Sequence, residues 1–283
     1  MNIQSTEHTI RINDSEVHYW EYGDASKPTI VVVHGYRGTH HGLEYIVDRL
    51  LPDFHIITPD LPGFGKSSDF PSLPHTIESY SSTVLQLITQ LSLEGCILLG
   101  HSMGTVVVAD ILKHAPAIAT AAIMINPVSE TPPKLRLLPG HIYHSIAGKY
   151  LPENLGNAVL KNKTLLLAGS IVMTKTKDPE LRKLIHWNHT TYMQNFASRK
   201  SLLESLASAN STSLSDYIPY LQIPLLMIVG KSDAIAPVQG QRRIAKRLPT
   251  AQLVEIERVG HIIHYEHPKQ AADAIKAFLA SQA

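Results

Sequence analysis

The chain has 283 residues, of which 44% are hydrophobic, a formal net charge of +1 and a single cysteine, Cys96. This charge balance gives no reason to expect nucleic acid or an anionic membrane as a partner, and one cysteine excludes an internal disulfide. No apolar run approaches the roughly 18 residues of a membrane helix, and the polar N-terminal residues lack the apolar core of a signal peptide. We therefore expect a cytoplasmic protein with one α/β domain and an insertion, or two small domains.

Two alternating patterns surround Asn13-Asp14 and predict an N-terminal antiparallel hairpin. Further along the chain, short β-branched runs alternate with segments of helical periodicity. Such alternation predicts a parallel sheet with right-handed crossovers, whose strands are buried on both faces. The expected strands are 8–12, 17–22, 29–33, 54–58, 96–100, 121–125, 224–230 and 252–256, and the expected helices are 42–51, 76–91, one that ends at 114, 237–248 and 268–279.

The alternation breaks between residues 128 and 220, where only helical patterns remain. Asp178-Pro179 is typical of a helix start, and residues 201–204 fit a capping box. So long a segment between two strands is either a lid or misread core. We interpret it as a helical cap inserted after the sixth strand, so that 1–127 and 221–283 form the core. The expected cap helices are 142–151, 154–174 and 180–196.

A serine stands between two glycines where the fifth strand meets the next helix, in Gly100-His101-Ser102-Met103-Gly104. This G-x-S-x-G pattern is that of a nucleophile elbow. The sharp turn holds the serine in a strained backbone conformation in which larger neighbours would clash, so glycines flank it. The helix that follows directs its first N–H groups at the reaction centre. We predict that Ser102 is a catalytic nucleophile rather than a small residue that fills a turn.

A serine nucleophile needs a base, and an acid that holds the base in the correct tautomer. In a parallel sheet these partners are expected on loops at the C-terminal ends of strands. Asp233 follows the strand that ends at Gly230, and His261 follows the last strand. The other possible acid position, after the sixth strand, holds Asn126. The order serine, aspartate, histidine therefore predicts a triad of Ser102, Asp233 and His261.

An oxyanion hole requires two N–H donors near the serine. One predicted donor is the backbone N–H of Met103, and the other is that of Tyr36, in the loop after the third strand. His34 fits a structural role in that loop, His101 fits an orienting role, and Trp187 fits the interior of the cap as well as a pocket wall. The candidate pocket residues are His34, Arg37, His101 and Trp187.

With these motifs in this order, the chain resembles the α/β-hydrolase superfamily over nearly all of its length outside 128–220. The resemblance implies a mostly parallel central sheet flanked by helices, with a helical cap. It says less about the reaction, because the family includes esterases, lipases, C–C hydrolases, cofactor-free haloperoxidases and non-enzymatic receptors. The motifs that carry it are His34-Gly35, residues 60–67 (DLPGFGKS), 100–104, 230–233 and Gly260-His261.

We predict a serine hydrolase that cleaves carboxylic esters of small to medium apolar molecules through an acyl-enzyme, without a cofactor. A metal site is not predicted. The pairs His141/His144 and His186/His189 have helical spacing, but no acid or cysteine nearby completes a ligand set. The apolar composition of the inserted segment favours an apolar substrate group, although any cap that packs on a core has such a composition.

Two alternatives remain open. One is a C–C bond hydrolase of aromatic ring-fission products, whose relatives usually carry asparagine at the position of His101 and glycine at that of Thr105. Such an enzyme commonly binds a substrate carboxylate through arginine. The other alternative is a triad-bearing protein that binds a small molecule and turns it over slowly. The candidate arginines are Arg37, Arg136, Arg182 and Arg199.

Overall fold

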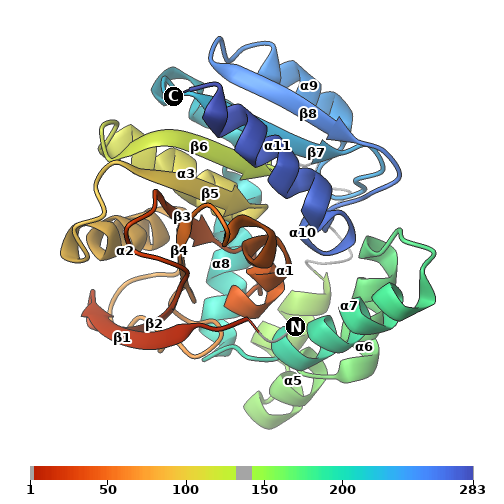
Figure 1. Cartoon of the computed structure of the whole chain (residues 1–283). Coiled ribbons are helices and arrows are strands. Elements are labelled where there is room, and N and C mark those ends of the chain that lie inside the picture. Colours follow the sequence, from red (N-terminus) through yellow and green to blue (C-terminus); the bar gives the residue numbers. More distant parts are fainter. Residues whose placement is uncertain (1–2, 132–141, 283) are drawn as a thin grey trace.

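A computed structural model describes residues 3–131 and 142–282. Its centre is an eight-stranded sheet (Figure 1). The strands are β1 (Thr6–Ile12), β2 (Ser15–Tyr22), β3 (Thr29–Val33), β4 (His55–Pro59), β5 (Cys96–His101), β6 (Ala119–Ile125), β7 (Leu225–Gly230) and β8 (Ala251–Ile256). They are ordered β1-β2-β4-β3-β5-β6-β7-β8. β1 and β2 pair antiparallel, β2 is antiparallel to β4, and every other neighbouring pair is parallel. The predicted mostly parallel sheet is confirmed.

Helices cover both faces of this sheet (Figure 1). The helices of the two layers are α1 (His40–Leu50), α2 (Ile77–Gln90), α3 (Met103–His114), α9 (Val238–Ala245) and α11 (Pro268–Ala280), and the short α10 (Ile263–Glu266) precedes α11. Within β3, Ile30 and Val32 face the layer of α1 and α11, whereas Val31 and Val33 face the layer of α2, α3 and α9. This double burial explains why the strand is a continuous apolar run.

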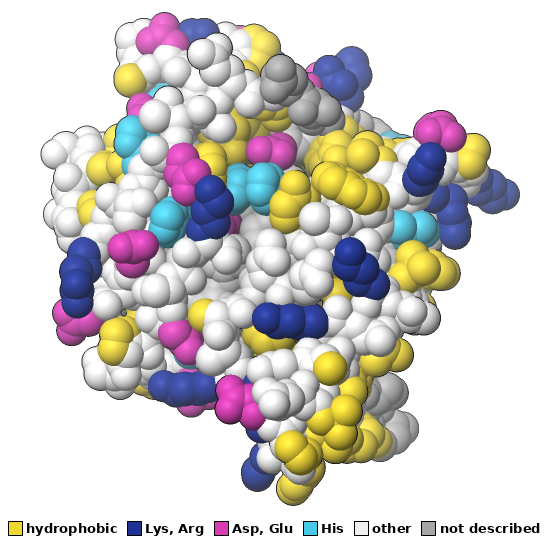
Figure 2. Space-filling model, turned by 90° about the horizontal axis from the view of Figure 1, so that it is seen from below, with side chains coloured by type: hydrophobic (Ala, Val, Ile, Leu, Met, Phe, Trp, Pro, Cys, Tyr) yellow, Lys and Arg dark blue, Asp and Glu magenta, His cyan; other side chains and the backbone are white. Residues whose placement is uncertain are grey.

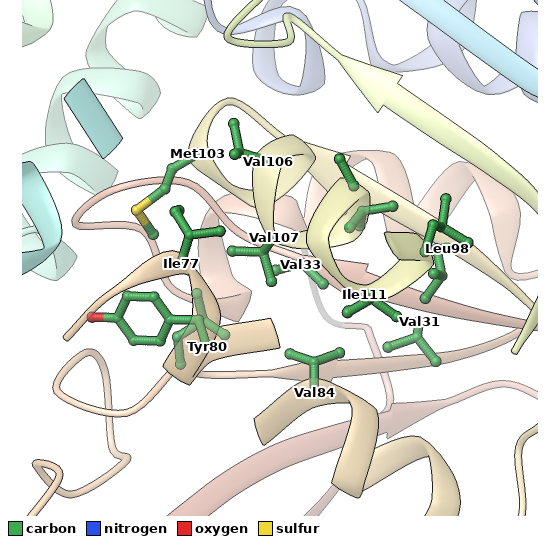
Figure 3. Packing of buried hydrophobic residues seen from close by; sticks show 14 of the residues in the cluster. Val31, Val33, Ile77, Tyr80, Val84, Leu98, Met103, Val106, Val107 and Ile111 are labelled. Atoms are coloured by element: carbon green, nitrogen blue, oxygen red, sulfur yellow. The ribbon is translucent and has the colours of Figure 1, made fainter. Parts of the chain in front are cut away.

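The layer of α2 and α3 carries the helix that follows Ser102. Figure 3 shows Val106, Val107 and Ile111 of α3 packed over strand residues such as Val33, with α2 beside them. These side chains are almost completely buried. Each fully buried aliphatic side chain of this size contributes about 1.5–3 kcal/mol to folding. The start of α3, and with it the turn at Ser102, therefore rests on rigid core packing.

Between β6 and β7 the described chain forms η1 (Ile146–Tyr150), α5 (Glu153–Leu160), α6 (Lys163–Met173), α7 (Pro179–Tyr192), α8 (Arg199–Ser211), η2 (Leu214–Asp216) and η3 (Ile218–Tyr220). The helix expected over 154–174 is in fact two helices, because the Asn162 side chain accepts hydrogen bonds from the backbone N–H groups of Thr164 and Leu165 and starts α6. Asp178 caps α7 as predicted. The predicted capping box at 201–204 is wrong: Ser198 caps α8, and Ser201 is its partner in the box.

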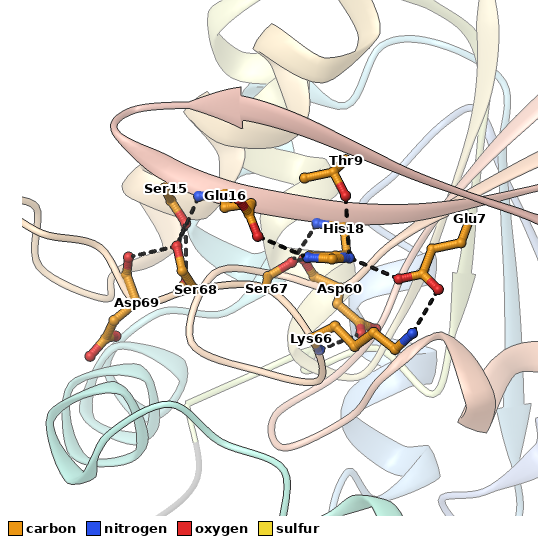
Figure 4. A network of polar contacts seen from close by, with 10 residues as sticks. All are labelled: Glu7, Thr9, Ser15, Glu16, His18, Asp60, Lys66, Ser67, Ser68 and Asp69. Atoms are coloured by element: carbon orange, nitrogen blue, oxygen red, sulfur yellow. Dashed lines mark hydrogen bonds and ion pairs between the residues drawn. The ribbon is translucent and has the colours of Figure 1, made fainter.

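The turn after β4 joins three parts of the chain. The buried Asp60 accepts hydrogen bonds from the backbone N–H groups of His40 and Lys66. Ser67 donates to the Asp60 carbonyl and accepts from the backbone of His18 in β2 (Figure 4). On its other side the turn pairs with the chain before α8, through the bridge between Phe64 and Phe196. The contacts of Ser67 therefore hold the turn against β2.

No helix in residues 3–131 or 142–282 is long and apolar enough to cross a membrane.

Candidate active site

Ser102 occupies the turn between β5 and α3 with φ +52° and ψ −121°, a conformation that L-residues rarely adopt. The two flanking glycines make this turn possible. A Cβ at Gly104 would lie 2.2 Å from the Val33 carbonyl oxygen, and a Cβ at Gly100 would lie 2.5 Å from the Gly104 carbonyl oxygen. Backbone atoms thus fill the space that any side chain would need, which is why the G-x-S-x-G spacing is required here.

The three predicted triad residues meet at the C-terminal edge of the sheet. The Oγ atom of Ser102 lies 2.7 Å from Nε2 of His261, and Nδ1 of His261 lies 2.7 Å from Oδ2 of Asp233. Asp233 follows β7, and His261 lies between β8 and α10. His261 and Asp233 are buried, whereas Ser102 is partly exposed. The serine can therefore meet a ligand while its two partners stay shielded from solvent.

The Asp233 carboxylate is held by four donors. Its Oδ1 accepts from the backbone N–H groups of Ile235 and Ala236, and its Oδ2 accepts from Asn126 Nδ2 and from the His261 ring. Burial of the carboxylate opposes ionisation, but the nearby His261 ring and the two backbone donors outweigh it and lower the pKa of Asp233. An ionised carboxylate fixes the proton of His261 on Nδ1, so that Nε2 faces the serine as a hydrogen-bond acceptor.

Two backbone N–H groups near Ser102 have no acceptor among the described residues. They belong to Tyr36, in the loop after β3, and to Met103, the first residue of α3. Both residues line the same cavity as Ser102. Paired donors of this kind can stabilise an anion that forms beside the serine. The residues predicted for an oxyanion hole thus lie beside the three residues predicted for the triad.

The cavity next to Ser102 has a volume of about 710 Å³, within the range of small-molecule sites. Core residues line one side, and the inserted helices line the other through Met173, Asn188, His189, Tyr192 and Leu206. Helix α7 and the end of α6 pack on α1 and α10 around Tyr45, Ile185 and Tyr265. The residues of this cavity therefore come from both parts of the chain.

The four candidate pocket residues have different surroundings. His34 lines the cavity but is fixed in its loop, since its ring contacts the Gly35 carbonyl and accepts from the Leu61 backbone N–H. Arg37 is buried, and its guanidinium donates to the carbonyl oxygens of Met193 and Leu160. Both residues line the cavity, but their side-chain nitrogens already hydrogen-bond to backbone groups.

His101 and Trp187 differ more sharply. His101 lines the cavity, and its Nε2 donates to the carbonyl oxygen of His261 at 2.9 Å, which ties the elbow to the histidine loop. Trp187, in contrast, is 54% exposed on α7 and is not among the residues that line the cavity. The expectation that it forms a pocket wall does not hold, because it lies on the outer side of α7 while Asn188 and His189 face inward.

Two further imidazoles, which the sequence reasoning did not place in the pocket, continue from His101 along the cavity wall. His264 packs edge-on against His101, with ring centroids 4.1 Å apart, and its buried Nδ1 has no hydrogen-bond partner. His189 reaches the same wall from α7. Burial lowers the pKa of His101 to about 3 and that of His189 to about 4, and it holds the pKa of His264 well below 6.5. This wall is therefore polar and uncharged at neutral pH. The sequence signal that could have placed His264 in the pocket is its position three residues after His261.

One of the two histidine pairs considered for metal binding shares a hydrogen-bond partner. His186 and His189 both hydrogen-bond to the Ser170 hydroxyl, and His141 lies outside the described residues. In the described chain, the group His40, His41 and Glu44 could offer three ligand atoms. The rings of His40 and His41 are tilted by 41° with centroids 3.8 Å apart, and Nδ1 of His40 is already hydrogen-bonded to Asp60.

Comparisons with known proteins agree on one family. The family model described as the alpha/beta hydrolase fold matches residues 28–268. A putative carbamate hydrolase, RutD, of Pseudomonas syringae is 25% identical over 94% of this chain and 98% of its own. Lipase 1 of Psychrobacter immobilis is 29% identical over 92% of this chain and 79% of its own.

Solved structures show the same fold. The enol-lactonase of Burkholderia xenovorans superposes with a TM-score of 0.82 over 96% of this chain and 100% of its own, at 19% identity. An esterase of Thermogutta terrifontis superposes with a TM-score of 0.77 over 99% of both chains, at 20% identity. The sheet order, the turn at Ser102 and the match of the family model lead to one conclusion: this chain belongs to the alpha/beta hydrolase family.

Proposed function

We propose that this protein is a serine hydrolase that cleaves carboxylic esters of small to medium apolar molecules. The observation that carries the proposal is the continuous contact from Ser102 through His261 to Asp233, at 2.7 Å for each step, at the wall of a cavity of about 710 Å³. The relatives' names, a putative carbamate hydrolase and a lipase, support hydrolysis as the class of reaction.

In the proposed mechanism, Nε2 of His261 takes the Ser102 proton as Oγ attacks the acyl carbon. The backbone N–H groups of Tyr36 and Met103 bind the oxyanion, and each such donor contributes typically about 3 kcal/mol to transition-state stabilisation. Protonated His261 then gives its proton to the leaving alcohol, and the acyl group stays on Oγ. Water, deprotonated by the same imidazole, releases the acid and restores the serine. Asp233 remains ionised throughout.

We further propose that residues 128–220 act as a cap that sets specificity, over a core of 1–127 and 221–283. Support comes from the inserted helices, whose inward residues Asn188, Tyr192 and Leu206 form the wall of the cavity beyond Ser102. A substrate would therefore bind between the two parts. The loop that holds Arg37 would fix their relative position, since Arg37 bonds to carbonyls at the ends of α5 and α7.

The surroundings of the arginines favour an ester over a ring-fission product. C–C hydrolysis of such a product calls for a cation that binds the substrate carboxylate. In the described lining, Arg37 is committed to two carbonyls, and Arg243 pairs with both oxygens of Glu130. Arg182 and Arg199 donate to backbone carbonyls and do not line the cavity, and Arg136 lies outside the described residues.

A fluorescent phosphonate probe tests the nucleophile directly. We expect one adduct, located by mass spectrometry on Ser102 and absent from Ser102→Ala. The matched control is Ser129→Ala, because Ser129 lines the same cavity and its loss should leave labelling intact. Labelling that persists in Ser102→Ala would refute the assignment.

The reaction class is tested on the unmodified protein with p-nitrophenyl esters of increasing chain length and with a dienoate ring-fission product. We expect turnover of short or medium esters and none of the dienoate. A higher kcat/KM for the dienoate than for the best ester would favour the C–C hydrolase. Labelled Ser102 without turnover of either substrate would favour the binding protein.

A further inference from the structure

Helix α6 exposes apolar side chains where a surface helix normally presents polar ones. Its sequence is KTLLLAGSIVM. Leu165 and Val172 are 46% and 63% exposed, and they share one side of the helix with the exposed Ala168 and Gly169. A Cβ at Gly169 would meet no atom within 4 Å. This side of α6 therefore has no partner within the described chain.

The exposed apolar surface extends over the neighbouring helices. Nine of the eleven exposed large hydrophobic side chains of the described chain lie between residues 142 and 187, so they are confined to the inserted segment. In Figure 2, hydrophobic side chains gather on the half of the face where α5 to α7 lie, with Lys and Arg side chains beside them. We define the apolar face by these residues: Tyr150, Leu155, Leu165, Ile171, Val172, Leu184 and Trp187.

The charged side chains at the two ends of α6 are mostly lysines. Residues 154–177 contain four lysines and neither aspartate nor glutamate. Lys161 and Lys163 lie at the start of α6, and Lys175 and Lys177 lie just beyond its end. All four are exposed, and none forms an ion pair with a described carboxylate. The ends of α6 thus carry more positive than negative charge, although Lys161 lies over the Phe196 ring and the Glu266 carboxylate accepts from the backbone N–H groups of Lys175 and Thr176.

From this arrangement we infer that the apolar face docks on an anionic phospholipid bilayer. An apolar helix side with flanking lysines matches the boundary between acyl chains and anionic headgroups. A second copy of this chain fits less well, because face-to-face pairing would bring two sets of four unpaired lysines together. Met173, at the end of α6, lines the cavity, so docking places one wall of the site next to the lipid. The docking itself does not depend on the proposed function. Only the entry of a lipid-derived ester from the bilayer into the cavity rests on it.

Co-sedimentation of the full chain with vesicles tests this inference. We expect binding to vesicles of phosphatidylcholine with phosphatidylglycerol, weaker binding to phosphatidylcholine alone, and a loss of binding with added salt. Leu165→Asp with Val172→Asp should abolish binding. Lys163→Gln with Lys177→Gln should weaken it about tenfold or more. The control, Lys246→Gln with Lys269→Gln, removes the same charge from the exposed surface of the core and should bind like the wild type.

Circular dichroism checks that each variant is folded, and phosphonate labelling of Ser102 is followed in parallel. Absence of binding to anionic vesicles at low salt overturns the inference, as does equal weakening by the core control. Light scattering that shows a dimer, dissociated by the Leu165→Asp pair, would instead assign the face to self-association. If vesicles bind but Ser102 is not labelled, the docking surface stands and the proposed function fails.

Discussion

At the scale of single residues, the proposed triad acid has two possible positions in this sheet, one after β6 and one after β7. Asn126 follows β6 and takes φ +46°, and its Nδ2 donates to Oδ2 of Asp233 at 2.9 Å. A second donation, to the Gly260 carbonyl, ties it to the loop of His261. Asn126 thus lies where a carboxylate could also approach the His261 ring, and here it orients the acid that follows β7.

Asp233→Asn is expected to fold and to lose about 10⁴-fold in kcat, because the amide can hold His261 in the wrong tautomer. Adding Asn126→Asp to that variant should restore about tenfold or more, since a carboxylate returns to the neighbourhood of Nδ1. Initial rates on the best p-nitrophenyl ester measure both effects.

Asn126→Asp alone serves as the control, and it should lower activity because two adjacent carboxylates disfavour ionisation of one another. Retention of more than about a tenth of wild-type activity by Asp233→Asn would show that another group acts as the acid.

At the scale of elements, Arg37 connects the loop after β3 to the inserted helices. Its φ is +56°, and its guanidinium donates to the carbonyls of Leu160, the last residue of α5, and Met193, directly after α7. A cation at two helix C-termini satisfies carbonyls that have no partner within the helix and interacts favourably with both helix dipoles.

Arg37→Ala is expected to lower the free energy of unfolding by about 2–3 kcal/mol, because three charge-assisted hydrogen bonds to two carbonyl oxygens are lost and the Leu160 carbonyl stays buried. Urea denaturation measures this loss, and limited chymotrypsin digestion should cut first within 142–220. Arg37→Lys should recover only part of the stability, since an ammonium cannot reproduce the planar fork. Arg49→Ala, a substitution of a half-exposed arginine, is the control. An equal loss of unfolding free energy in this control would show that the bonds of Arg37 to the two carbonyls do not stabilise the fold.

The sequence predicted elements well where one periodicity or one turn dominates. The run at Thr29–Val33 and the glycines around Ser102 each allow one local solution, so the strands and the elbow were expected at their observed places. The interior of 154–174 misled the prediction, because a single capping residue, Asn162, overrides continuous helical periodicity. The role of Arg37 and the outward position of Trp187 depend on tertiary contacts, which no local pattern encodes.

At the scale of the whole molecule, bulk numbers conceal local organisation. A net charge of +1 gave no reason to expect an anionic surface as a partner, yet residues 154–177 contain four lysines and no acid. The sixteen histidines are also unevenly placed. His101, His189 and His264 are buried together in the wall of the cavity, where burial keeps them neutral. This polar wall makes folding stability dependent on pH.

The sign of that dependence follows from proton linkage. In the unfolded chain these histidines bind protons as pH falls through about 6.5, whereas the folded protein binds them only near about 3 for His101, about 4 for His189 and well below 6.5 for His264. Above about pH 6.5 these histidines are neutral in both states and do not affect folding, whereas below it protonation favours the unfolded chain. Between about pH 6.5 and its own lowered pKa, each histidine should remove about 1.4 kcal/mol of unfolding free energy per pH unit. The carboxylates of Asp60 and Asp233, whose pKa values are lowered from 3.8, act only at lower pH.

We therefore expect the free energy of unfolding, measured with urea between about pH 7.5 and 5.5, to be flat at first and then to fall steeply. His264→Phe removes one titrating group without removing a hydrogen bond from its unpaired Nδ1, and the fall should become shallower by about 1.4 kcal/mol per pH unit. His114→Gln, at the exposed end of α3, should leave the slope unchanged. If the unfolding free energy of His264→Phe falls with pH as steeply as that of the wild type, His264 is protonated in the folded protein. The wall of the cavity would then not be neutral in this pH range.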